Sequence, residues 1–369
     1  MKTLQTSIPP DVSELFELPV PILSVYLGGV PPTHEYSTAD LHGAVLRAVA
    51  QGSPPKAVEA LRKVIEEIPA GTEAKAVFIG ADGSSRLFPI PGAPGEDRVI
   101  ASAVPHLTPL LAWWQTHPAH VVAVVDRAGA DITVFPAGDH SPTSTTVTGP
   151  DDEIVRTAPG GPAQPRYQRR AEDSWKHNAG HDVEAIAAAL ERSDARLLLV
   201  AGDIRTIQLL TDQLPAWIQN EVEVRMVSGG RSEDGSTDLR AQQVEAEMTE
   251  AAHRHGRRLL EEFADRSGQN GRSVEGVAAT LRALARGQVR TLLVTDQAAD
   301  GGVAWFGPAA TDIGLHVTGL TRNGVEPERG PVTDVAVRAA LLGGADVWVL
   351  DPRTPGAPYH GVGALCRFP

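Results

Sequence analysis

A proline- and glycine-rich stretch near the middle of the chain limits what residues 157–170 can form. Its prolines lack a backbone N–H donor and hold φ at about −65°, while Gly160 and Gly161 add conformational freedom. The prolines are Pro159, Pro162 and Pro165. The first half of this stretch therefore cannot be a regular helix or strand. The sequence predicts a loop that follows a strand hairpin and precedes an amphipathic helix beginning near Arg169.

The same stretch carries positive charge on an acidic chain. The protein has a formal net charge of -13, yet no acidic residue occurs between Arg156 and Arg170. Three arginines surround Tyr167, namely Arg166, Arg169 and Arg170. Guanidinium groups bind phosphate through planar, multidentate hydrogen bonds, and an aromatic ring can stack on an exposed base. An acidic protein with one basic projection is suited to a defined RNA site rather than to nonspecific coating of nucleic acid.

Length and composition favour several domains in a reducing compartment. The chain has 369 residues, which is too many for one ordinary core. Its single cysteine, Cys366, excludes an intrachain disulfide and fits a reducing cytoplasm. We find no signal-peptide core near the N-terminus and no run of about 20 apolar residues that could span a bilayer. The sequence therefore predicts a cytoplasmic protein without a membrane partner.

Patterns of apolar residues divide the chain into three mixed α/β domains. Their predicted bounds are 1–117, 118–237 and 238–369. In the first domain, residues 22–27 form a predicted strand, and Asp82-Gly83 marks the turn of a predicted hairpin. The second domain shows the order strand, strand, helix, strand, helix, strand.

The third domain begins with a long charged helix over residues 238–265. Apolar residues in 274–284 recur at helical spacing, and residues 290–294 and 347–350 predict strands. Residues 361–368 predict an edge strand. This alternation of helices and strands predicts an α/β/α sandwich.

Motifs in the middle domain resemble those of the archaeal and eukaryotic release factors and Pelota. Members of that superfamily carry a Gly-Gly-Gln loop, followed by a basic, aromatic-containing helix that ends in a His-Asn pair. Here Gly160-Gly161-Pro-Ala-Gln164 precedes Arg166-Tyr-Gln-Arg-Arg170 and Lys176-His177-Asn178. In the third domain, residues 274–294 look like the helix-then-strand signature of the family, and residues 361–368 are similar to its C-terminal strand. The likeness is closest to bacterial members, the ribosome hibernation factors of the Balon group.

This resemblance implies a hibernation factor that occupies the A site of idle ribosomes and blocks tRNA entry. Contact with ribosomal RNA of both subunits and delivery by elongation factor Tu, with GTP or GDP, are implied as well. The residues implied to bind RNA are Gly160, Gly161, Gln164, Arg166, Tyr167, Arg169, Arg170, Lys176 and His177. We expect no cofactor and no DNA partner.

The spacing of the glycine loop argues against catalysis. Pro162-Ala163 separates Gly161 from Gln164, so the Gly-Gly-Gln motif is absent. An extended chain spans about 3.3 Å per residue, and a misplacement of about 1 Å already lowers rates strongly. The first domain also lacks an Asn-Ile-Lys-Ser codon-reading motif. We therefore expect no enzyme activity and no catalytic residue. The alternative is a rescue or release factor that hydrolyses peptidyl-tRNA through Gln164.

A weaker alternative is a metal-dependent nuclease of the ribonuclease-H-like type. Asp126, Asp131 and Asp203 lie at ends of predicted strands, where carboxylates can hold two metal ions for phosphodiester hydrolysis. Asp131, however, lies beside a predicted hairpin turn, where aspartate is common. We therefore assign no metal ligand.

A second basic cluster spans His253–Arg258. Acidic residues flank it, namely Glu250, Glu261 and Glu262. On a helix, opposite charges three or four residues apart pair with each other. We interpret this cluster as a salt-bridged helix face rather than as an RNA-binding surface.

Overall fold

The computed structural model describes residues 11–27, 38–67, 74–91, 97–137, 142–148, 164–231, 236–266, 272–296, 302–322, 324 and 326–368. The chain divides into two compact units. Among the described residues, the first consists of 116–255, and the second of 11–115 and 256–368. The predicted middle domain lies inside the first unit. The finer division of the chain into three domains stays a prediction.

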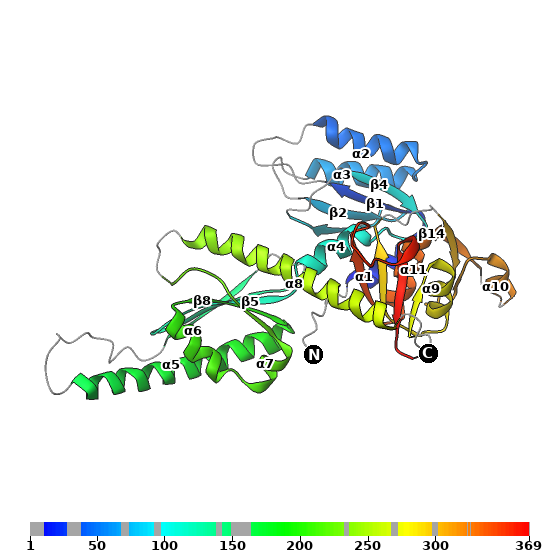
Figure 1. Ribbon diagram of the computed structural model, residues 1–369. Helices are drawn as coiled ribbons and strands as arrows, with labels where there is room; N and C mark the ends of the chain where they lie inside the picture. The colour runs from blue at the N-terminus through cyan, green and yellow to red at the C-terminus, as the bar shows by residue number, and fades with distance from the viewer. Residues whose placement is uncertain are drawn as a thin grey trace. The chain divides into compact units, whose positions relative to one another are not determined.

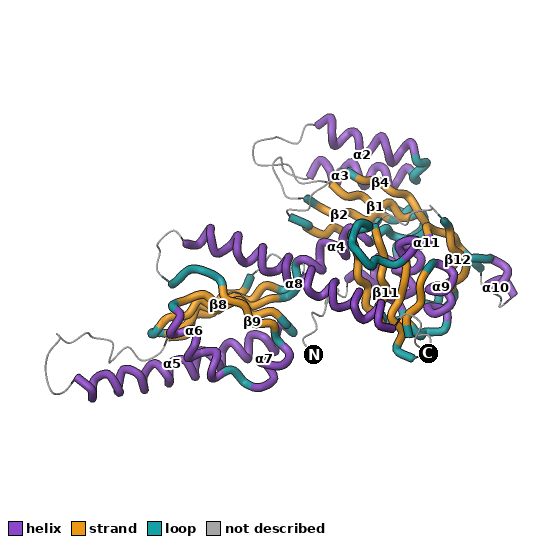
Figure 2. The backbone as a smooth tube through the Cα atoms, in the orientation of Figure 1, coloured by secondary structure: helices purple, strands orange, loops and turns teal. Residues whose placement is uncertain are grey.

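The first unit is built on a five-stranded mixed sheet (Figures 1 and 2). Its strands are β5 (His120–Asp126), β6 (Gly129–Phe135), β7 (Thr143–Thr148), β8 (Leu197–Gly202) and β9 (Glu223–Met226). Their order is β7-β6-β5-β8-β9, with β5, β8 and β9 parallel and β6 antiparallel to both of its neighbours. The helices are α5 (Gln164–Ser193), α6 (Ile204–Gln213), α7 (Ala216–Glu221) and the first part of α8 (Ser236–Arg266).

Helices cover both faces of this sheet, which explains the near-continuous apolar sequence of its central strands. Val121 and Val125 of β5 pack in a core that α5 and α6 share. Val122 and Val124 alternate with them and pack in a second core, which contains Met248 of α8. The period of two along β5 therefore sends successive side chains to opposite helical layers.

Two glycines permit close approach of backbones at one end of this sheet. Gly129 has φ 148°, and a Cβ atom there would lie 2.0 Å from the carbonyl oxygen of Val147. Gly202 has φ 150°, and its Cβ atom would lie 2.3 Å from the carbonyl oxygen of Val125. No other residue type fits these positions without displacing a strand. They fix the β5–β6 turn and the end of β8.

The second unit contains a four-stranded antiparallel sheet from the N-terminal region. In spatial order its strands are β3 (Ser85–Pro89), β2 (Lys75–Ile79), β1 (Ile22–Leu27) and β4 (Arg98–Ser102). The helices of this region are α1 (Asp11–Glu14), η1 (Leu15–Glu17), α2 (Thr38–Ala50), α3 (Pro55–Glu67) and α4 (Thr108–Thr116). Leu61 of α3 packs against Val25 on one face of the sheet, and Leu110 of α4 packs with Tyr26 on the other.

The C-terminal region of the second unit has a second four-stranded sheet. In spatial order its strands are β10 (Ser273–Glu275), β16 (Val362–Cys366), β11 (Val289–Thr295) and β15 (Asp346–Leu350). A smaller sheet holds β13 (Ile313–Gly314), β12 (Val303–Phe306) and β14 (Glu328–Pro331). The helices are α9 (Val277–Ala285), α10 (Val317–Arg322), α11 (Val332–Leu342) and η2 (Tyr359–Gly361).

One core joins the two regions of the second unit. Leu107 and Trp114, from the N-terminal region, share this core with Leu292 of β11 and Val335 of α11. At the end of α4, the side-chain amide of Gln115 donates to the carbonyl oxygen of Val349 at 2.6 Å and accepts from the N–H of Val349 at 3.0 Å. The predicted first and third domains therefore contribute to a common core.

The predicted mixed α/β fold class is confirmed, whereas three local predictions are wrong. Helix α5 begins at Gln164 rather than near Arg169, because a proline is tolerated in the first helical turn. Residues 361–368 do not form an edge strand, since β16 is fully buried between β10 and β11. Val274 lies in β10 and not in the predicted helical stripe, which starts at Val277.

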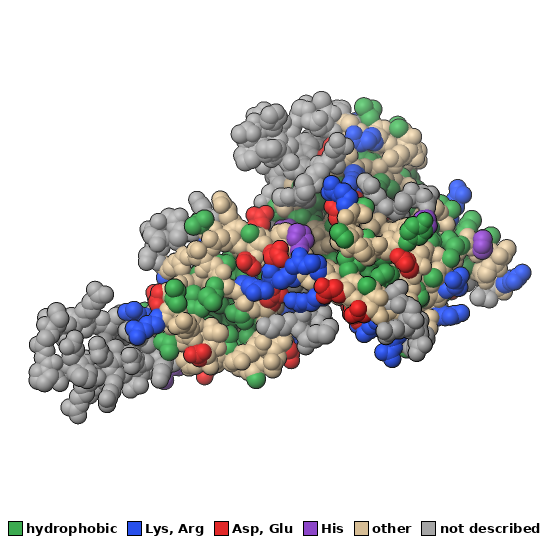
Figure 3. All heavy atoms as spheres, in the orientation of Figure 1, with side chains coloured by type: hydrophobic (Ala, Val, Ile, Leu, Met, Phe, Trp, Pro, Cys, Tyr) green, Lys and Arg blue, Asp and Glu red, His purple; other side chains and the backbone are tan. Residues whose placement is uncertain are grey.

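Charged side chains of both signs lie among one another on the face drawn in Figure 3. On α8, Arg254 lies within 4 Å of Glu250, and Arg266 pairs with Glu262. Opposite charges at this spacing stabilise an exposed helix modestly. Among the described residues, the helices are too short or too polar to cross a membrane.

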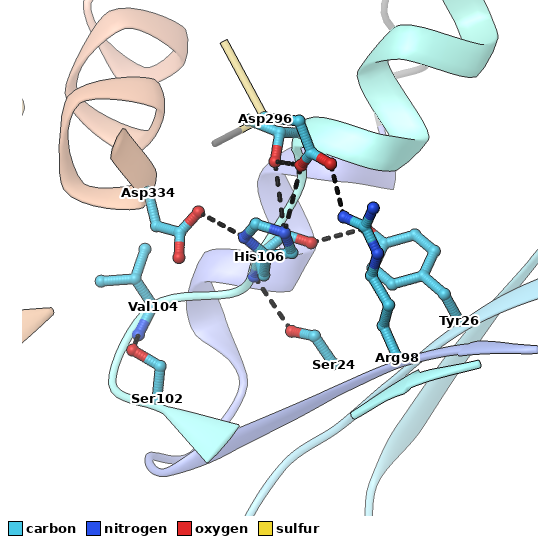
Figure 4. Close-up of polar contacts among 9 residues, drawn as sticks. Ser24, Tyr26, Arg98, Ser102, Val104, His106, Asp296 and Asp334 are labelled. Atoms are coloured by element: carbon cyan, nitrogen blue, oxygen red, sulfur yellow. Dashed lines mark hydrogen bonds and ion pairs between the residues drawn. The ribbon is translucent and has the colours of Figure 1, made fainter. Parts of the chain in front are cut away.

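A buried histidine connects three segments of the second unit (Figure 4). His106 lies between β4 and α4, and its Nδ1 atom is 2.8 Å from Oδ1 of Asp334 in α11. Its Nε2 atom is 3.5 Å from Oδ1 of Asp296, which follows β11. Asp296 also accepts a hydrogen bond from Thr108 Oγ1 at 2.8 Å and pairs with Arg98.

This arrangement keeps the histidine charged at neutral pH. Burial alone would lower the pKa of His106, but hydrogen bonds to Asp296 and Asp334 outweigh it and raise the pKa to about 9. Burial would raise the pKa of Asp296, yet hydrogen bonds from His106 and Arg98 hold it well below its usual range. The imidazolium therefore forms a buried bridge between the N-terminal and C-terminal regions of the unit.

We expect His106→Gln to lower the free energy of unfolding and to remove part of its dependence on alkaline pH. The pKa is about 9 in the folded state and about 6.5 in the unfolded state, so the contribution is complete below about pH 6.5 and is lost as pH rises through about 9. The full contribution to the free energy of unfolding is about 3 kcal/mol, from about 1.36 kcal/mol per pKa unit. Urea unfolding of both proteins between pH 6 and pH 9.5 measures it.

His120→Gln is the matched control, because burial lowers the pKa of His120 in the first unit to about 4. That variant should keep the alkaline decline of the parent protein. An unchanged decline in His106→Gln would contradict the buried imidazolium.

Candidate RNA-binding helix

The predicted basic run lies in the first half of α5. This helix has 30 residues, so it is about 45 Å long. Positions 166, 169 and 170 stand at i, i+3 and i+4 and therefore share one helical face. In Figure 1 the first half of α5 extends past the strands of its own unit. The chain thus presents the basic run on a helix rather than on a loop.

The structure describes only some of the predicted RNA-binding residues. Gly160 and Gly161 fall outside the described residues. Gln164 is the first residue of α5, with a helical backbone. The side chains at positions 164–176 are not among those described, and they include the following predicted residues: Gln164, Arg166, Tyr167, Arg169, Arg170 and Lys176. Of the whole predicted set, only His177 has a described side chain, and it is exposed.

The second half of α5 anchors the helix on the sheet. Val183, Ile186 and Leu190 are buried against the β5 and β8 side of the core. At the start of this anchored half, Asn178 is only 1% exposed, and its Nδ2 atom donates to the carbonyl oxygen of Arg127 at 2.9 Å. Arg127 lies in the β5–β6 turn, so this hydrogen bond ties the helix to the turn. The two members of the His-Asn pair therefore face opposite ways.

The carboxylates considered for a nuclease have structural partners. Arg231 donates from Nε to Oδ2 of Asp131 at 2.9 Å and from Nη1 to Oδ1 of Asp126 at 3.0 Å. These contacts hold the pKa of Asp131 below its usual value. Asp203 caps α6, where it accepts hydrogen bonds from the backbone of Arg205 and Thr206. Within the described part of the chain, no three metal-ligating side chains come together. The geometry therefore gives no support to the nuclease alternative.

The sequence did not predict a buried polar cluster on α5. Asp182 is 1% exposed, its Oδ1 atom has no hydrogen-bond partner, and burial raises its pKa to about 6 in spite of nearby Arg231. Asn178, one turn earlier, has an unpaired buried Oδ1 atom as well. The sequence did contain a signal for burial of these two residues, because positions 178 and 182 border the apolar stripe of α5. Arg231 had no such signal, since its carboxylate partners lie far away in the sequence.

Arg254 of the second basic cluster forms ion pairs within the protein. Arg254 donates from Nε to Glu223 Oε1 of β9 at 2.9 Å and lies within 4 Å of Glu250. The predicted salt-bridged face is confirmed for this arginine. Arg257 and Arg258, also on α8, are exposed.

Part of the chain matches a known family. Residues 119–269 match the family model described as bacterial archaeo-eukaryotic release factor family 2. Over these residues the chain is similar to the bacterial archaeo-eukaryotic release factors. The matched segment contains the five-stranded sheet, the whole of α5 and α8, and the Arg231 ion pairs. The resemblance inferred from sequence motifs is confirmed at this level, whereas assignment to the hibernation group stays a prediction.

Individual relatives are distant from this chain. An uncharacterized protein of Mycobacterium tuberculosis, found in two strains, is 26% identical over 284 residues, which are 75% of this chain and 73% of that protein. Saccharomyces cerevisiae Dom34, a translation termination-like factor, is 8% identical, with coverage of 100% of this chain and 93% of Dom34 and a TM-score of 0.43. Archaeoglobus fulgidus Pelota is 15% identical, with coverage of 80% and 79% and a TM-score of 0.33.

We expect Asn178→Ala to loosen the start of the anchored half of α5. Removal of the side-chain donor deletes the hydrogen bond to the carbonyl oxygen of Arg127, and a typical hydrogen bond contributes about 1 kcal/mol. Faster amide hydrogen exchange over residues 178–183 should report the change. Ser193→Ala is the control at the far end of α5, because its hydroxyl donates only within the same helix. Equal acceleration of residues 178–183 in both variants would rule out a specific anchoring role for Asn178.

Proposed function

We propose that this protein is a ribosome hibernation factor that occupies the A site of idle ribosomes and blocks tRNA entry without hydrolysing peptidyl-tRNA. In this proposal the N-terminal region faces the decoding centre, and α5 reaches toward the peptidyl-transferase centre. Ribosomal RNA of both subunits is therefore the main partner. Delivery by elongation factor Tu, with GTP or GDP, is part of the proposal and rests on family resemblance alone.

The observation that carries the proposal is a basic helix anchored at its far end. Apolar packing and the Asn178 hydrogen bond hold the second half of α5 on the sheet. A rigid helix loses less conformational entropy on binding than a flexible loop does, so its charges can reach a defined RNA site at lower cost. The match to a release-factor family covers this helix completely. The acidic balance of the chain, with a formal net charge of -13, disfavours nonspecific RNA binding.

The position of Gln164 supports binding without chemistry. Its backbone belongs to α5, and two residues separate it from Gly161. A glutamine that begins a helix cannot follow the path of a glutamine that directly follows two loop glycines. Electrostatic docking tolerates such a displacement, because attraction between charges varies slowly with distance, whereas orientation of a water for ester hydrolysis does not.

We expect Arg169→Glu/Arg170→Glu to weaken ribosome binding strongly. Each lost phosphate contact should also flatten the dependence of log affinity on log salt by about one unit, so the double variant should lose about two. Co-sedimentation with vacant ribosomes at several salt concentrations measures both effects. The matched control is Arg257→Glu/Arg258→Glu on α8, which reverses the same charge on another exposed basic surface. Equal weakening by the two double variants would mean that α5 is not the RNA-binding surface.

Gln164→Ala separates binding from hydrolysis. We expect the parent protein, at stoichiometric amounts, to release no peptide from a ribosome–peptidyl-tRNA complex, and Gln164→Ala to bind ribosomes as the parent does. Release of labelled peptide measures the first point and co-sedimentation the second. Peptide release by the parent protein that Gln164→Ala abolishes would instead establish the rescue or release factor.

A further inference from the structure

Two exposed histidines face each other on α5. His177 and His181 stand four residues apart, so they lie one turn apart on the same helical face. Their Nε2 atoms are 3.2 Å apart, and their ring centroids are 4.7 Å apart with an angle of 78° between the planes. Neither ring is needed for the core, because both side chains are exposed. We propose that this pair is a binding site for a divalent transition-metal ion of the zinc class.

The separation of the two nitrogens fits a shared metal ion. Zinc–imidazole bonds are about 2.0–2.1 Å long, and two such bonds at a tetrahedral angle hold their nitrogens about 3.3 Å apart. The observed distance between the Nε2 atoms is 3.2 Å. Without an ion this contact is a hydrogen bond between the two rings, so an ion binds when both Nε2 atoms are free of protons. Neutral imidazole is a preferred ligand of zinc, copper and nickel.

The backbone that carries the pair is fixed in advance. Between and beside the two histidines, Asn178, Ala179, Asp182 and Val183 are buried on the opposite side of the helix. The hydrogen bond of Asn178 to Arg127 holds the same turn. An ion therefore binds without ordering a flexible segment, which removes a main cost of binding.

The site is suited to binding rather than to metal-dependent hydrolysis. Its spacing equals that of the His-Glu-x-x-His motif of zinc proteases, in which the glutamate is the general base. Here Asn178 occupies the position of that glutamate, and it is buried with its amide on a backbone carbonyl. Among the described residues, no third histidine, cysteine or carboxylate joins the pair to complete a ligand set. Water would fill the remaining coordination positions.

Titration calorimetry of the full chain with zinc chloride tests the proposal. The parent protein should bind one zinc ion, and His177→Ala or His181→Ala should each weaken that binding by about tenfold or more, since even outer-shell changes cost about tenfold. His253→Ala is the matched control, because His253 is an exposed histidine on α8 that lies beside Glu250. It should leave the affinity unchanged. No zinc binding by the parent protein, or an equal loss in His253→Ala, would overturn the proposal.

Thermal unfolding provides a second readout that does not depend on heats of binding. An ion that binds only the folded state raises the midpoint of unfolding. Zinc should therefore raise the midpoint of the parent protein and of His253→Ala, but not that of His177→Ala/His181→Ala. Both substituted side chains are exposed, so the double variant should fold as the parent does. An equal rise in the double variant would locate the zinc elsewhere and refute the site.

Discussion

The second unit depends on contacts between two stretches of chain that are far apart in the sequence. Its chain leaves at Gln115 and returns at Gly256, so only noncovalent contacts join its two regions. An apolar core provides most of the contacts between the two regions, and the His106 imidazolium between Asp296 and Asp334 provides a charged contact. A buried charge pair adds less net stability than its Coulomb attraction suggests, but the loss of one partner is severe because the other charge remains buried. The cluster therefore specifies how the two regions meet as much as it stabilises them.

The first unit holds the long helix α5 by one end. Glycines 129 and 202 let the strands approach closely, and this fixes the turn whose carbonyl group receives Asn178. The second half of α5 packs on the sheet, and its first half extends past the strands of the unit. Both proposals made for this helix, RNA binding and metal binding, depend on that division. Charge and ligand chemistry on one face are useful only because the opposite face is fixed.

The sequence predicted features that follow from a local pattern, but not those that depend on contacts between residues distant in the sequence. The turn at Asp82-Gly83 and the stripe of Val183, Ile186 and Leu190 follow from nearest-neighbour geometry, and the structure has both. The start of α5 was misplaced because Pro165 was treated as a helix breaker, although the first helical turn tolerates it. Asp126 and Asp131 suggested a metal site only because their partner, Arg231, lies about a hundred residues further along the chain.

The sequence by itself determined the class of fold and most of the local elements, because those depend on residue type and on periodicities of two and 3.6. Tertiary structure alone decided which of two adjacent residues, His177 or Asn178, faces outward. It also placed β16 inside its sheet and joined residues 8–115 to residues 256–369 in one core. The physical reason is the same in each case. A contact between distant residues is set by packing and by competition among partners, and no single stretch of sequence encodes either.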